Sequence, residues 1–218
     1  MDPPGRTAAR HLLETTMPAI AARHLSRALA ATVAAAACTT LLTAPALAQT
    51  RTLHDATGDV VSGPEEVDLP TTPEPDRTAG DVTSIRVEHR RHVVRLVMRE
   101  AEVPEVTGDA MAVHVLSLRT DEGKRAELDL VTSADRPQGQ RVWSFGERTS
   151  CRGLRTTVSY ADDEVRVTIP RRCLSAPRWV KVGGGAGVLD GDRLFADDAQ
   201  LDGEVRQDVV LGPKVRRG

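Results

Sequence analysis

The segment 165–182 constrains the fold more than any other part of this 218-residue chain. From Val165 to Ile169, apolar residues alternate with polar ones, which is the pattern of a β-strand with one buried face. Pro170 ends this strand because proline has no N–H group to donate to a neighbouring strand. Cys173 lies in the connection that follows, and a second apolar run begins at Trp179. The segment therefore predicts two strands joined by a short connection that carries a cysteine.

The period-two alternation recurs through most of the chain after Gln49, whereas no amphipathic run of helical period appears there. Further strands are expected at 85–87, 94–98, 111–118, 126–130, 142–145 and 154–160. Short strands that follow one another about every 10–15 residues are typical of all-β sandwiches and barrels. We therefore predict an all-β fold, an antiparallel, jelly-roll-like β-sandwich of about eight or nine strands.

The cleanest alternating runs also identify the expected core, because every second residue of such a strand faces inward. The side chains expected on inward faces are Leu128, Leu130, Val165, Val167, Ile169 and Val180. Trp179 is expected to be largely buried as well.

Residues 17–48 have the pattern of a secretory signal peptide. Arginines come first, an apolar stretch follows at 28–42, and a small-residue cleavage motif ends at Ala48. We therefore expect a secreted protein whose mature chain begins at Gln49. The apolar stretch is too short and wrongly flanked for a stable membrane anchor. A rival interpretation makes Cys38 a lipid-attachment site.

The remaining boundaries follow from composition. Residues 1–16 add nothing to the signal pattern, and we interpret them as a mis-assigned start before Met17. Residues 49–202 are the expected β-sandwich domain, and the proline-rich acidic segment 61–80 is predicted to be a mobile loop within it. Alternatively, the domain begins at Asp81. The charged segment 203–218 is predicted to be a polar tail.

Cleavage after Ala48 leaves two cysteines, Cys151 and Cys173, one on each side of the hairpin expected at 154–169. An even number of cysteines in an exported chain indicates a disulfide, because the compartment is oxidising. Counting outward from the hairpin turn places the two cysteines opposite one another. We therefore predict a Cys151–Cys173 disulfide that closes the open end of the hairpin.

The charge balance argues against nucleic acid as a partner. Of the 29 basic and 31 acidic residues, four and two lie in residues 1–48, which leaves the expected mature chain with a formal net charge of −4. Nucleic-acid-binding domains ordinarily carry a basic excess. We therefore expect an extracellular glycan or protein as the partner and no nucleic acid.

Two sequence patterns resemble those of small secreted proteins of unknown function from GC-rich Gram-positive bacteria. The first runs from Asp55 through Gly58 to His89, and the second is Ile169-Pro170-Arg171-x-Cys173-Leu174-x-x-Pro177-x-Trp179-Val180. The resemblance covers most of residues 52–199. It implies a jelly-roll fold similar to that of family 9 carbohydrate-binding modules, and it brings no catalytic residues.

Aspartates near both ends of the expected domain are the best candidate site. Asp55, Asp59 and Asp81 lie at turns near its start, and Asp197 is one of several aspartates near its end. The first and last strands of a sandwich often lie together, and Ca²⁺ prefers carboxylate and carbonyl oxygens. These four aspartates are therefore the predicted calcium ligands. The alternative is that they cap turns and solvate loops.

Two weaker candidate sites use other side chains. Carbohydrate binding needs exposed aromatic rings, and Trp143 and Tyr160 are the candidates for that role. His89 and His92 flank an expected hairpin turn and, with a third histidine, would offer transition-metal ligands.

The sequence offers no catalytic motif. Ser144 lacks the flanking glycines of a nucleophile elbow, and the glycine-rich run 183–187 lacks the lysine of a phosphate-binding loop. We therefore predict a non-enzymatic secreted module for extracellular binding or structure. The alternatives are a carbohydrate-binding module and a secreted hydrolase.

Overall fold

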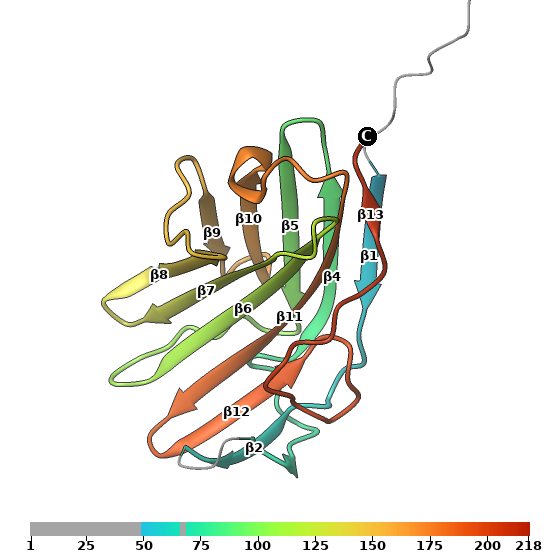
Figure 1. Cartoon of the computed structure of the whole chain (residues 1–218). Coiled ribbons are helices and arrows are strands. Elements are labelled where there is room, and N and C mark those ends of the chain that lie inside the picture. The colour runs from blue at the N-terminus through green and yellow to red at the C-terminus, as the bar shows by residue number, and fades with distance from the viewer. Residues whose placement is uncertain (1–48, 66–68) are drawn as a thin grey trace, which may run out of the picture. The chain divides into compact units, whose positions relative to one another are not determined.

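The computed structural model describes residues 49–65 and 69–218, which form two antiparallel β-sheets packed face to face (Figure 1). The predicted start and signal peptide, 1–16 and 17–48, lie outside the described residues. The only helix in the described part is a 3₁₀ turn, η1 (Arg171–Leu174), and no described helix could cross a membrane. The predicted all-β sandwich is confirmed.

One sheet has five strands in the order β1-β4-β5-β10-β9. These strands are β1 (Gln49–His54), β4 (Val82–His89), β5 (Val93–Glu100), β9 (Arg155–Ser159) and β10 (Glu164–Pro170). In Figure 1 this sheet lies behind the other one.

The other sheet follows the order β3-β2-β12-β11-β6-β7-β8, and β13 pairs with β11 beside that path. Its strands are β2 (Val61–Pro64), β3 (Thr72–Pro73), β6 (Met111–Thr120), β7 (Arg125–Ser133), β8 (Arg136–Phe145), β11 (Trp179–Asp190), β12 (Arg193–Asp198) and β13 (Val215–Arg216).

The inward faces of the two sheets form one hydrophobic core. Each of the six predicted core residues is at most 1% exposed: Leu128, Leu130, Val165, Val167, Ile169 and Val180. Trp179 is only half-buried, because it lies on the face of β11 opposite Val180, where Lys214 covers its ring at 4.4 Å from the centroid.

Two segments that lack alternation are nevertheless part of the fold, and both predictions for them need correction. The expected loop 61–80 contributes β2, whose first three residues are buried beside β12. The expected tail 203–218 contributes β13, and Val215 in it is 1% exposed. These short strands raise the strand number above the predicted eight or nine. Composition could not reveal them, because each is stabilised by pairing with a longer neighbouring strand.

The Cys151–Cys173 disulfide is confirmed, with 5.6 Å between the two Cα atoms. It joins the β8–β9 connection to η1. In the hairpin between the two cysteines, Glu164 of β10 pairs with Ser159 of β9. Both cysteines lie beyond the paired residues, as the count outward from the turn predicted.

Candidate metal centre

Three strand ends meet at one end of the sandwich and bring the predicted aspartates together. Asp55 follows β1, and its backbone N–H donates to the Thr83 carbonyl over 3.1 Å, which holds it beside β4. Asp81 directly precedes β4, and Asp197 is near the end of β12 in the other sheet. The site therefore draws on residues from both sheets.

Asp55, Asp59 and Asp197 form a carboxylate trio. One oxygen from each lies within 4.8 Å of the others, which is close enough for a single ion to contact all three. Asp197 is only 3% exposed. Within the described part of the chain, one buried oxygen of each residue accepts no hydrogen bond: Asp55 Oδ2, Asp59 Oδ1 and Asp197 Oδ1. Buried polar atoms are rarely left this way without a partner.

Backbone N–H groups hold the carboxylates of the site in place. Val82 donates to Asp197 Oδ2 over 2.7 Å, and Gly203 donates to Asp59 Oδ2 over 3.3 Å. Such bonds fix the carboxylates while leaving the opposite oxygens free. The trio is therefore oriented by the backbone and not by a cationic side chain.

Asp81 has a supporting position. Its Oδ2 accepts a 2.8 Å hydrogen bond from the Gly58 N–H, and its Oδ1 has no partner among the described residues. Gly58 has φ +75°, and a Cβ added there would lie 2.9 Å from the Pro75 carbonyl oxygen. The turn that carries Asp55 and Asp59 therefore requires glycine, and Asp81 stabilises that turn.

The electrostatics disfavour three ionised carboxylates in the absence of a cation. The pKa of Asp197 is raised to about 8, chiefly by burial and also by the charges of Asp59 and Asp55, against the lowering effect of the Val82 N–H. Burial, followed by the charge of Asp59, raises the pKa of Asp55 to about 7. Burial also raises the pKa of Asp81. A bound cation would reverse these shifts because it favours the charged forms.

The residues fit a hard cation such as Ca²⁺. The trio supplies only oxygen ligands, which Ca²⁺ prefers and softer metals do not select. Three carboxylates leave further coordination positions for second carboxylate oxygens, turn carbonyls and water. Asp198 is not part of this set, because it follows Asp197 directly in β12, and successive side chains of a strand point to opposite faces of the sheet.

The histidine alternative does not assemble. His89 is fully buried with Nδ1 3.1 Å from the Val215 carbonyl oxygen, whereas His92 is exposed in the turn after β4. His114 is 1% exposed, and its Nδ1 lies 2.7 Å from Glu100 Oε1. Sequence analysis missed this buried pair, because alternation shows that both side chains face inward but not that they meet.

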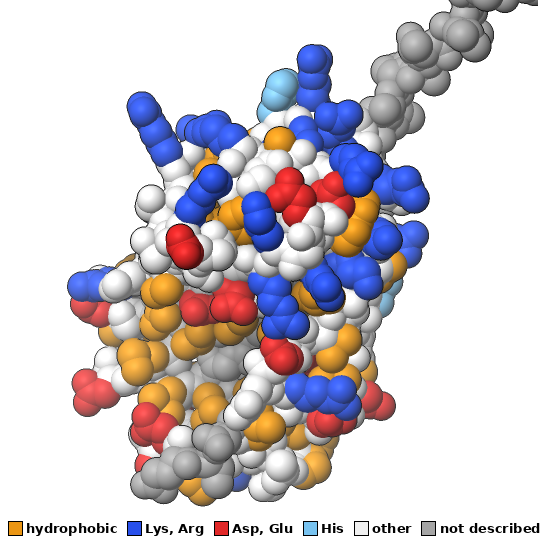
Figure 2. All heavy atoms as spheres, in the orientation of Figure 1, with side chains coloured by type: hydrophobic (Ala, Val, Ile, Leu, Met, Phe, Trp, Pro, Cys, Tyr) orange, Lys and Arg blue, Asp and Glu red, His pale blue; other side chains and the backbone are white. Residues whose placement is uncertain are grey.

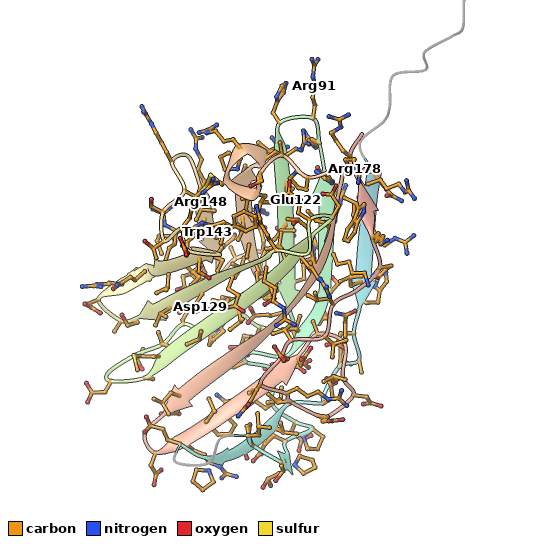
Figure 3. All side chains as sticks on the ribbon, in the orientation of Figure 1. Arg91, Glu122, Asp129, Trp143, Arg148 and Arg178 are labelled. Atoms are coloured by element: carbon orange, nitrogen blue, oxygen red, sulfur yellow. A yellow bond between two sulfur atoms is a disulfide. The ribbon has the colours of Figure 1, made fainter. Side chains whose placement is uncertain are left out.

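The two aromatic candidates are placed differently. Trp143 on β8 is 5% exposed and belongs to the core, so little of its ring is free to stack on a sugar (Figure 3). Tyr160 is half-buried, and its hydroxyl donates to the Pro137 carbonyl over 2.6 Å. It lines a pocket of about 280 Å³, and it keeps the carbohydrate alternative open.

Comparison with known proteins adds no family. No family model, no curated protein and no solved structure matches the chain. The resemblance to small secreted proteins therefore stays a prediction, and the functional argument depends on the geometry of the site.

Proposed function

We propose that this chain is a calcium-binding β-sandwich module that works outside the cell, in binding or in structure and not in catalysis. The observation that carries the proposal is the convergence of Asp55, Asp59 and Asp197, each with a buried oxygen that lacks a hydrogen-bond partner. A cation is the partner that suits three carboxylates of like charge.

The position of the site suggests what calcium does. Asp197 belongs to β12 of one sheet and accepts a hydrogen bond from Val82 of the other. Asp55 and Asp59 lie in the connection that leads from β1 in the five-stranded sheet to β2 in the eight-stranded sheet. An ion bound to all three would fasten this connection to β12 and so hold the two sheets together at this end.

An extracellular setting agrees with one further observation and with the affinity expected of such a site. The chain forms a disulfide, which persists in oxidising compartments. Extracellular modules commonly bind Ca²⁺ with dissociation constants of about 10⁻⁴–10⁻³ M, a range that suits a site with three carboxylates and no complete ligand cage.

Isothermal titration calorimetry of Ca²⁺ into EDTA-treated, desalted protein tests the proposal. We expect one binding event per chain and a melting temperature that rises with calcium. At a concentration 100 times the dissociation constant, the stabilisation would be about 2.7 kcal/mol. The proposal would be refuted by the absence of binding heat together with an unchanged melting temperature at about 10 mM Ca²⁺, which is ten times the weakest expected dissociation constant.

A further inference from the structure

The end of the sandwich opposite the aspartate trio is strongly basic, although the chain as a whole is not. Five parts of the chain close this end: 90–92, 121–124, 146–154, 171–178 and 216–218. They contain ten basic residues and three acidic ones. We call this surface the basic end, and Figure 2 shows many arginine and lysine side chains gathered over the upper part of the molecule.

The charges of the chain are therefore segregated along the strands. Four connections at the trio's end, 55–60, 101–110, 161–163 and 190–192, contain nine acidic residues and no basic residue. Net charge conceals this arrangement because the two ends largely cancel. Clustering of basic residues on one surface is a better indicator of an anionic partner than net charge is.

Most of the arginines at the basic end have no carboxylate partner. Among the described arginines of this end, only Arg90 and Arg178 form salt bridges, with Glu88 and Asp121, and Lys124 pairs with Glu122. The exposed arginines that form none are Arg91, Arg148, Arg152, Arg172, Arg216 and Arg217. Arg91, Arg148 and Arg178 come from three different connections and lie at the same end of the molecule in Figure 3.

Arg171 adds a buried charge and organises the surface. It is 8% exposed, and its guanidinium donates only to backbone carbonyls: Arg91 at 2.6 Å, Ala176 at 2.7 Å and Pro177 at 2.6 Å. These bonds tie the β4–β5 turn to the segment after η1. No described carboxylate forms a salt bridge with Arg171, although Asp121 lies near enough to favour its charge, so Arg171 adds to the positive potential of the basic end.

The disulfide holds two further arginines side by side. Arg152 follows Cys151 and Arg172 precedes Cys173, and Arg172 Nη2 donates to the Arg152 carbonyl over 2.6 Å. The arginines are thus carried on a fixed backbone and not on loose loops. Preorganisation of this kind lowers the entropic cost of binding.

We propose that the basic end is a docking surface for a linear polyanion that carries phosphate groups along its length. Guanidinium groups bind phosphate through paired N–H donors, and here they are spread over several connections, as an extended partner requires. One phosphate group fits the pocket of about 370 Å³ lined by Arg178, Trp179, Arg216 and Arg217. The neighbouring arginines contact the phosphates that follow.

The surface suits a phosphate chain that carries no bases better than it suits a membrane or a nucleic acid. The exposed large hydrophobic residues of the described chain are Met111 and Val142, on β6 and β8, so no apolar side chain at the basic end would insert into a bilayer. Trp179 is the aromatic ring of this end, and Lys214 covers it. No exposed ring is therefore available there to stack on bases, which single-strand-binding proteins ordinarily use.

Fluorescence anisotropy with end-labelled, long-chain inorganic polyphosphate tests the proposal. We expect binding that weakens as salt increases, with a logarithmic slope of about −0.7 for each phosphate neutralised. The R216Q/R217Q variant should bind more weakly, with a slope shallower by about 1.4. R216K/R217K should retain most of the affinity, because it keeps both charges.

The matched control is R136Q/R206Q, which removes the same charge from exposed arginines outside the basic end. It should bind polyphosphate like the wild type. Equal weakening in the control, or no binding of the wild type at low salt, would overturn the proposal. Tighter binding to phosphatidylglycerol vesicles or to DNA than to polyphosphate would also overturn it. Every arm is run with and without calcium, so failure of the calcium site would not be mistaken for failure here.

Discussion

The backbone N–H of Val82 donates a 2.7 Å hydrogen bond to Asp197 Oδ2, and this bond joins the first residue of β4 in one sheet to β12 in the other. Asp197 therefore has two roles at once. One of its oxygens fastens the sheets together, and the other belongs to the carboxylate trio. Any change in the charge of Asp197 should therefore alter both the stability of the protein and its affinity for calcium.

The first prediction concerns pH. The folded-state pKa of Asp55 and of Asp197 is raised from 3.8 to about 7 and about 8, so the folded protein holds more protons than the unfolded chain between about pH 4 and pH 8. Their contribution to stability is complete below about pH 4 and is lost as the pH rises toward 8. Melting curves of EDTA-treated protein should therefore show a lower melting temperature at pH 8 than at pH 5.5.

Calcium should remove this decline, because it binds the deprotonated carboxylates. With excess Ca²⁺ the melting temperature at pH 8 should equal or exceed the value at pH 5.5. If the calcium-free protein gains stability from pH 5.5 to pH 8, the carboxylate trio is not under the repulsion that its geometry implies.

The second prediction separates charge from hydrogen bonding at Asp197. An Asp197→Asn variant keeps an oxygen to accept the Val82 N–H but removes one buried charge. We expect the calcium-free variant to be at least as stable as the wild type, and its calcium-dependent rise in melting temperature to disappear. Paired melting curves with EDTA and with calcium measure both effects.

Asp202→Asn is the control for that experiment, because Asp202 is exposed beyond β12 and is not a member of the trio. It should respond to calcium like the wild type. A full calcium response in Asp197→Asn would remove that residue from the ligand set.

Much of the fold followed from alternation, because a strand with one buried face records that face in its sequence. The strand at 165–169 is an example: Val165, Val167 and Ile169 are buried in the core as predicted. Segments without alternation were misjudged. Val61 and Val215 lie in short, polar or proline-rich contexts, and their burial depends on longer strands elsewhere in the chain.

The candidate site was predictable in part for a similar reason. Four aspartates were predicted, Asp55, Asp59 and Asp81 from turns near the start of the domain and Asp197 from its place near the end, and the structure brings all but Asp81 into one trio. The basic end was not predictable, because its arginines are dispersed over five parts of the chain and only the topology gathers them. The negative net charge of the whole chain gave no sign of a basic surface.

The third prediction concerns the buried pair of Glu100 and His114, which links β5 in one sheet to β6 in the other. Both side chains are at most 1% exposed, so removal of one partner leaves a buried polar group unpaired. Glu100→Ala should therefore destabilise the protein by about 3–5 kcal/mol in urea unfolding.

The volume-conserving double variant Glu100→Met/His114→Leu should lose less stability than Glu100→Ala, because no polar partner is left behind. Glu105→Ala, an exposed acid in the connection after β5, is the control and should change stability by less than about 0.5 kcal/mol. A double variant that is less stable than the single one would show that the pair contributes more than it costs to bury.

The fourth prediction concerns the disulfide, which serves both the fold and the proposed docking surface. Cys151 and Cys173 are 22 residues apart in sequence, and both pack against the hydrophobic core. The C151S/C173S variant should lose about 2–5 kcal/mol of stability, since the unfolded chain is no longer constrained. Urea unfolding of the oxidised wild type and the variant measures this loss.

The same variant should affect the two ends of the molecule differently. Arg152 and Arg172 are neighbours of the bridged cysteines, so loss of the bridge should loosen their arrangement and weaken polyphosphate binding. The aspartate trio lies at the other end, so calcium affinity should change little under conditions in which the variant remains folded. Mass spectrometry of non-reduced peptides provides the direct check on the wild type. Free thiols at both positions in protein from an oxidising compartment would rule out the bridge. The fixed arrangement of these two arginines would then be ruled out as well.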